Sequence, residues 1–103
     1  MSRLDRLRAM LEADPADAFV LYALGQEYAA GGRHEEAVAH FEKCLAADPG
    51  TLYAYYHKAR AQEALGNRDG ALATLRQGAQ AAREAGDAKA LGEITALADE
   101  WSP

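Results

Sequence analysis

Apolar residues recur along this chain at the three- and four-residue spacing that places side chains on one face of an α-helix. Leu4, Leu7 and Leu11 mark such a face near the start, and Leu91 and Ile94 belong to another near the end. Alanine, the best helix former, is the most frequent residue, whereas Val, Ile and Thr, which favour strands, are few. The chain is therefore predicted to be almost wholly helical.

Proline, glycine and capping residues divide this pattern into segments. Asp14-Pro15 ends the first helix, because proline cannot donate a backbone hydrogen bond and restricts the residue before it. Gly31-Gly32 ends the second by supplying left-handed backbone without steric cost. The residues placed to cap helix starts are Asp17, Thr51 and Asp87. Short turns require antiparallel neighbours, and the predicted helices cover residues 2–13, 18–30, 34–47, 52–64, 69–85 and 88–101.

One pattern occurs twice along the chain, at a distance of 34 residues. The first copy consists of Leu21, Leu24, Gly25, Tyr28, Ala37, Phe41 and Pro49. The second, less regular copy consists of Tyr55, Ala59, Gly66, Ala71 and Leu75. The small residues Gly25 and Ala59 are expected where two helices of a pair cross, and the larger Phe41 and Leu75 are expected to fill the space between pairs.

These offsets resemble the tetratricopeptide repeat pattern, with Leu21 in place of its opening tryptophan. The resemblance implies an all-α fold in which antiparallel helix-turn-helix repeats stack in a short right-handed superhelix of about six helices. It also implies a single domain over residues 1–103. The parts of that domain are an N-terminal half-repeat helix (1–17), repeat one (18–51), repeat two (52–85) and a C-terminal capping helix (86–103).

The last helix has two interpretations. As a cap, it covers the open end of the stack, and Trp101 folds onto the helix predicted over 69–85. As a partner helix or dimerisation element, it uses Trp101 as an anchor. The cap is favoured, and Leu91-Gly92 in this helix echoes the Leu24-Gly25 pair of the first repeat.

The second repeat departs from the pattern at two positions. Lys58 and Gln62 stand where the first repeat has Leu24 and Tyr28. Two polar residues on a normally packed face indicate either looser packing, with the long side chains reaching outward, or a slight rotation of this helix. Both interpretations remain open at this point.

The resemblance implies that a ligand would contact the first helix of each pair, which lines the concave face. The family's contact positions hold three alanines, Ala29, Ala30 and Ala64. The other residues at these positions, with the adjacent His57, are Phe19, Tyr22, Gln26, Tyr53, Tyr56, His57, Arg60 and Glu63. Independently of the family, three- and four-residue spacing places the residues from the first repeat on one face of their helix and those from the second repeat on one face of theirs. Tyr and Arg are enriched at binding hot spots, so these residues are predicted to form a peptide-binding groove.

The net charge of −5, from 11 basic and 16 acidic residues, argues against nucleic acid as a general partner. The charge is uneven, because the start holds Arg3, Arg6 and Arg8 whereas the end is acidic. Contact between opposite ends would make a structural or self-assembly module acting through its terminal helices. A monomer or weak homodimer is therefore expected.

No set of residues suggests catalysis, a metal or a cofactor. His34 and His40 are six residues apart, and His57 is on another helix, whereas a helical metal pair needs a spacing of three or four. Cys44 is the single cysteine, lies on an apolar stripe and has no histidine near it in sequence. An enzyme is not expected, and one cysteine fits a reducing compartment such as the cytoplasm.

The sequence thus predicts a non-catalytic protein–protein interaction module that binds a peptide or protein segment in the concave groove. No apolar run approaches the ~20 residues that a membrane span needs, so no membrane partner is expected. The ligand predicted from the groove residues is an extended segment with an acidic residue for Arg60 and an apolar one for the rings. Self-assembly through the terminal helices is the alternative.

Overall fold

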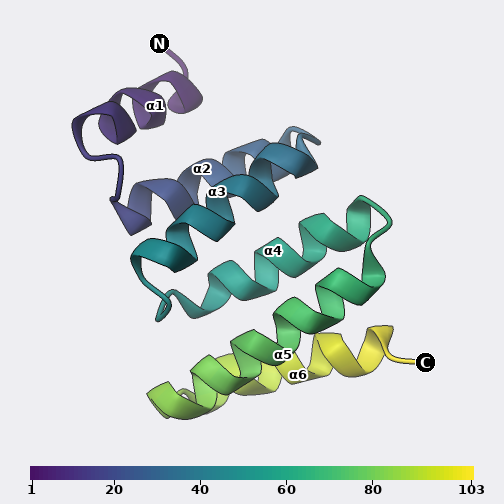
Figure 1. The fold of residues 1–103 in the computed structure, drawn as a ribbon. Coiled ribbons are helices and arrows are strands. Elements are labelled where there is room, and N and C mark those ends of the chain that lie inside the picture. The colour runs from purple at the N-terminus through teal and green to yellow at the C-terminus, as the bar shows by residue number, and fades with distance from the viewer.

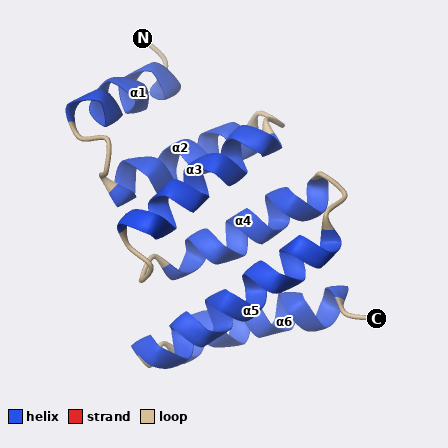
Figure 2. Ribbon diagram, viewed as in Figure 1, coloured by secondary structure: helices blue, strands red, loops and turns tan.

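The helices predicted from the apolar spacing are all present. The computed structural model describes residues 1–103 and contains six helices and no strands (Figure 2). Their bounds are α1 (Arg3–Ala13), α2 (Ala18–Ala30), α3 (His34–Ala47), α4 (Leu52–Ala64), α5 (Arg68–Ala85) and α6 (Ala88–Trp101). Helix α5 begins one residue earlier than predicted, because the Asn67 side chain accepts a hydrogen bond from the Gly70 backbone N–H at 2.9 Å and acts as the N-cap.

Consecutive helices run antiparallel and form a stack of hairpins, with the two chain ends at opposite ends of the stack (Figure 1). The most extensive contacts lie within the pairs α2–α3 and α4–α5. The even-numbered helices also touch one another in order, since α2 contacts α4 and α4 contacts α6. The helices α2, α4 and α6 therefore lie on one common face, and the particle measures 43 × 30 × 18 Å.

Close helix crossing in the first pair depends on a glycine. A Cβ atom added at Gly25 would lie 2.5 Å from the Phe41 Cε1 atom, well inside van der Waals contact. The Phe41 ring of α3 therefore packs directly on the α2 backbone and is fully buried. This confirms that Gly25 is small because of a crossing, and it shows that the neighbour at the crossing is Phe41.

Two of the three predicted caps form, and one does not. The side chains of Asp17 and Asp87 accept hydrogen bonds from the backbone N–H groups of Val20 and Ala90. Thr51 occupies the N-cap position of α4, but its side chain makes no capping hydrogen bond. The capping role predicted for the Thr51 side chain is therefore wrong, although α4 begins where expected.

The two polar residues of the second repeat both find partners. The Lys58 side chain is 15% exposed, and its Nζ atom lies 3.9 Å from the Glu42 Oε2 atom on α3. The Gln62 Oε1 atom accepts a hydrogen bond of 2.6 Å from the Oγ1 hydroxyl of Thr74, a buried residue of α5. Specific polar contacts therefore occupy the positions where Leu24 and Tyr28 pack in the first repeat.

The echo of Leu24-Gly25 in Leu91-Gly92 does not extend to a close helix crossing. Gly92 is exposed, and a Cβ atom added there would meet nothing within 4 Å. The crossing partner of Gly25 is Phe41 on α3, the helix that follows α2, and no helix follows α6 in the structure. The buried residues of α6 are Ala90, Ile94 and Leu97.

Candidate functional site

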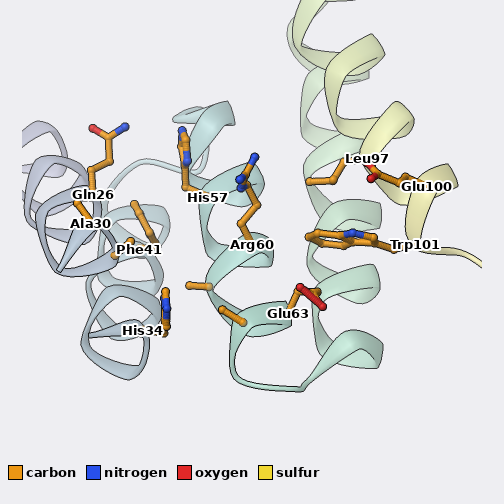
Figure 3. A pocket seen from close by; sticks show the side chains of 13 residues that line it. Gln26, Ala30, His34, Phe41, His57, Arg60, Glu63, Leu97, Glu100 and Trp101 are labelled. Carbon is orange, nitrogen blue, oxygen red and sulfur yellow. The ribbon is translucent and has the colours of Figure 1, made fainter. Parts of the chain in front are cut away.

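A groove of about 620 Å³ crosses the face formed by α2, α4 and α6. Four of the predicted binding residues line it, namely Gln26 on α2 and His57, Arg60 and Glu63 on α4 (Figure 3). The small side chains of Ala29, Ala30, Ala61 and Ala64 keep the groove open between these polar groups. The structure therefore brings together residues from both repeats that are about one repeat length apart in sequence.

The other four predicted residues do not line this groove. Phe19, Tyr22, Tyr53 and Tyr56 lie nearer the starts of α2 and α4, and Phe19 is 73% exposed. The rings of Tyr53 and Tyr56 are 6.5 Å apart, measured between centroids. We call Phe19, Tyr22, Tyr53 and Tyr56 the aromatic row. A hydrogen bond of 3.3 Å from the Gln26 Nε2 group to the Tyr22 hydroxyl joins the aromatic row to the groove.

His57 is the residue at which the aromatic row and the groove meet. Its ring centroid lies 5.4 Å from that of Tyr56, 5.9 Å from that of Tyr22 and 6.2 Å from that of Phe41. Burial lowers the pKa of His57, and the nearby Arg60 charge lowers it further. The imidazole is therefore neutral at pH 7, and it offers one donor and one acceptor.

Arg60 is the free cation of the groove. It is exposed, forms no ion pair, and its Cζ atom lies 5.8 Å from the centroid of the Tyr56 ring. Glu63, one turn further along α4, is instead paired with Arg68, whose Nη2 atom is 3.3 Å from its Oε2 atom. Glu63 therefore does not neutralise Arg60, and the guanidinium remains available to a ligand.

Two tyrosines beside the groove, Tyr22 and Tyr53, stay protonated. Burial raises the pKa of Tyr22, and burial together with Glu93 raises the pKa of Tyr53. Their hydroxyl groups can therefore donate hydrogen bonds to a bound segment throughout the physiological pH range.

Sequence reasoning missed the wall that α6 contributes. Leu97, Glu100 and Trp101 line the groove opposite α4 (Figure 3). Trp101 also packs on α5 as expected of a cap, because it covers the cluster that contains Leu75 and lies 5.9 Å from the Arg68 Cζ atom. The alternation of helices was the available signal, since α6 follows α2 and α4 as the next first helix of a pair.

The remaining polar groups suggest no reactive centre. Burial raises the pKa of the Cys44 thiol, which favours its unreactive protonated form. No three His, Cys, Asp or Glu side chains lie close enough together to hold a metal ion. No helix has the length and apolar character needed to cross a membrane.

The Nδ1 atom of His34, at the edge of the groove, is buried without a hydrogen-bond partner.

The sequence profile of the family described as "Tetratricopeptide repeat" matches residues 28–93, which is more than half of the chain. The chain belongs to the tetratricopeptide repeat family. The predicted family and the all-α repeat fold are thereby confirmed. Tetratricopeptide domains generally mediate protein–protein interactions, and they are typically non-catalytic.

Solved tetratricopeptide structures are similar over most of the chain. A tetratricopeptide repeat domain protein from Salinibacter ruber is 36% identical, with a TM-score of 0.79 over 86% of this chain and 90% of that one. A Bordetella parapertussis protein is 25% identical, with a TM-score of 0.84 over 98% and 88%. The TPR2B domain of yeast Sti1, solved in a complex with pHsp70, is 26% identical, with a TM-score of 0.88 over 95% and 78%. A search of curated proteins gave no match.

Proposed function

We propose that this tetratricopeptide domain is a non-catalytic module that binds a peptide or protein segment in the groove between α2, α4 and α6. The observation that carries this proposal is the unpaired Arg60 in an open groove that small and apolar side chains line together with polar ones. Arg forks onto carboxylates with two parallel hydrogen bonds, so an acidic side chain of the segment would pair with Arg60. The aromatic row from Phe19 to Tyr56 would receive the apolar part of the segment.

Self-assembly through the terminal helices has weaker support. Its basis is the cluster of arginines near the N-terminus, but the Arg3 Nε atom already lies 2.7 Å from the Glu27 Oε1 atom. Arg8 donates hydrogen bonds of 3.1 and 2.9 Å to the Tyr28 hydroxyl. Two of these side chains are thus engaged within the chain, which favours the groove as the binding surface.

A pull-down from the lysate of the source cell, read by mass spectrometry, tests the groove. The baits are the native chain, an Ala64→Arg variant that fills the groove, and an Ala39→Arg variant. Ala39 is exposed on α3 outside the groove, so this variant adds the same side chain without blocking the site. We expect a protein that is captured by the native and Ala39→Arg chains and lost with Ala64→Arg.

Equal capture by all three baits would contradict binding in the groove. Capture of only the chain itself, together with a dimer in light scattering that dissociates in salt, would instead support the terminal helices. Circular dichroism of each variant confirms beforehand that the bait is folded.

A further inference from the structure

We infer that the groove selects a segment by a charge code that runs from α4 to α6. The segment would bring a carboxylate to Arg60, a bulky apolar side chain to Leu97 and Trp101, and a cation to Glu100. This inference rests on the proposed function and deepens it, because it states which side chains of the segment the groove accepts and where each of them lies.

The code follows from two opposite charges that face one groove without pairing. Arg60 on α4 and Glu100 on α6 are both exposed, and neither forms an ion pair or a side-chain hydrogen bond within the chain. Figure 3 shows Arg60 on α4 and Glu100 on α6, with the side chains of Leu97 and Trp101 pointing from α6 toward α4. A charge at the edge of a groove that has no partner within the protein is available to a partner from outside.

Glu63 and His57, the other groups of α4 that could carry a charge in the groove, do not obscure this arrangement. Glu63 is held by Arg68, and His57 is neutral at pH 7 because burial and Arg60 disfavour its protonated form. The opening therefore carries a single free cation and a single free anion at separate places. Such a pattern favours a segment that carries one charge of each sign, spaced to reach Arg60 and Glu100, and disfavours a segment with two charges of the same sign, since one pair of like charges would then face each other.

The apolar contact of the proposed code is made with the Trp101 ring. This ring is only half-buried, although it already packs on the cluster that contains Leu75 and Leu97. An apolar side chain placed against its open part would remove further apolar surface from water, and half-buried tryptophans are typical anchors of interfaces. We therefore assign affinity mainly to this contact, and orientation and selectivity to the two charges.

Panning of a displayed random-peptide library tests the code. The native chain is compared with Arg60→Glu, with Glu100→Arg and with Asp99→Arg as the matched control. Asp99 is exposed and adjacent to Glu100, but it faces a different hollow beside Arg76 and Arg83. The native chain should enrich peptides in which an apolar residue stands between an acidic and a basic residue.

The variants should switch the code one position at a time. Arg60→Glu should replace the enriched acidic residue by a basic one, and Glu100→Arg should replace the basic residue by an acidic one. Asp99→Arg should leave both unchanged. In fluorescence polarisation, the native peptide should bind about fivefold more weakly to either groove variant, which is the size expected for one exposed ion pair. A peptide with the corresponding charge reversed should recover the affinity.

Failure of the code and failure of groove binding give different results. Peptides that are lost with Ala64→Arg, but whose charges do not follow the Arg60 and Glu100 substitutions, would overturn the code and leave binding in the groove intact. Peptides that still bind to Ala64→Arg, or the absence of any enrichment by the native chain, would overturn both.

Discussion

The two repeats fill the same positions with different residues, and the differences compensate in pairs. In the first repeat, Gly25 leaves room for the Phe41 ring, whereas the equivalent positions of the second repeat hold Ala59 and Leu75. All four residues are buried. A gain of one methyl group on the first helix of the pair is thus accompanied by a smaller side chain on the second helix. Close packing requires this balance, because protein interiors leave few voids.

A second pair shows the same exchange in the opposite direction. Leu21 and Cys44 of the first repeat are replaced by the larger Tyr55 and by Gly78. A Cβ atom added at Gly78 would lie 2.6 Å from the Tyr55 Cβ atom, so the two helices approach closely where the glycine stands. The repeat pattern therefore fixes where the two helices touch and the total side-chain volume that fits there. Either helix can supply the larger side chain.

The third difference concerns polarity. Tyr28 and His40 form a ring contact in the first repeat, with centroids 4.9 Å apart. The equivalent residues of the second repeat, Gln62 and Thr74, form a hydrogen bond instead. At this pair of positions the first repeat is held by aromatic packing, while the second uses a hydrogen bond to α4, which contributes more groove residues than any other helix.

Removal of the central large residue should have the largest effect, and it should be larger in the first repeat. We expect Phe41→Ala to lower the free energy of unfolding by about 3–5 kcal/mol, because a fully buried ring is lost between α2, α3 and α4. Leu75→Ala should cost about 2–4 kcal/mol. Urea unfolding followed by circular dichroism measures both. A larger loss for Leu75→Ala would mean that the second repeat carries more of the stability.

A double-mutant cycle tests the compensation at the first crossing. Gly25→Ala should destabilise the fold by about 1–3 kcal/mol, because the new methyl group would collide with the Phe41 ring. Phe41→Leu in the same chain reproduces the pairing of the second repeat and should recover part of that loss. Unfolding free energies that simply add would show that the two positions do not share one volume.

Gly92→Ala is the matched control for this cycle. The same substitution is made in a helix, but in open space, so it should stabilise the protein by about 0.5–1 kcal/mol through helix propensity alone. If Gly92→Ala lowered the free energy of unfolding, the added methyl group would have to meet a neighbouring atom, and the position would not be in open space.

The polar contact of the second repeat should contribute less. Thr74→Val removes the donor to Gln62 and should cost about 0.5–1.5 kcal/mol. The double variant Thr74→Val with Gln62→Leu should be closer to the native stability, because no buried polar group is then left without a partner. If Thr74→Val alone has no effect, solvent already satisfies Gln62 and the hydrogen bond adds nothing.

The smallest expected effect is a pH dependence that comes from His57. Its pKa is lower in the folded chain than the ordinary value of 6.5, so the unfolded chain takes up the proton first as the pH falls. The contribution of neutral His57 is therefore fully present above about pH 6.5 and decreases as the pH falls through its folded pKa. Urea midpoints between about pH 8 and about pH 5 should fall less in His57→Gln than in the native chain. Parallel curves for the two proteins would contradict this.

The sequence alone determined the helices and the repeat frame. Apolar spacing, proline and glycine are local signals, and helix starts and ends depend on them because capping and backbone restrictions act within a few residues. The six helices were therefore predictable to within one residue at each boundary. The presence of Gln26, His57, Arg60 and Glu63 on one face also followed from spacing and the family pattern.

Only the tertiary structure decided which residues share the groove. Helix α6 packs so that Leu97, Glu100 and Trp101 line the same groove as Arg60, while Gly92 lies in solvent. The partners of Lys58 and Gln62 were likewise set by the distance between helices rather than by the residues next to them in sequence. Helix formation depends on residues that are close in sequence. The contacts between side chains of different helices depend instead on which helix supplies the larger side chain at each crossing, and they are fixed only when the whole stack is packed.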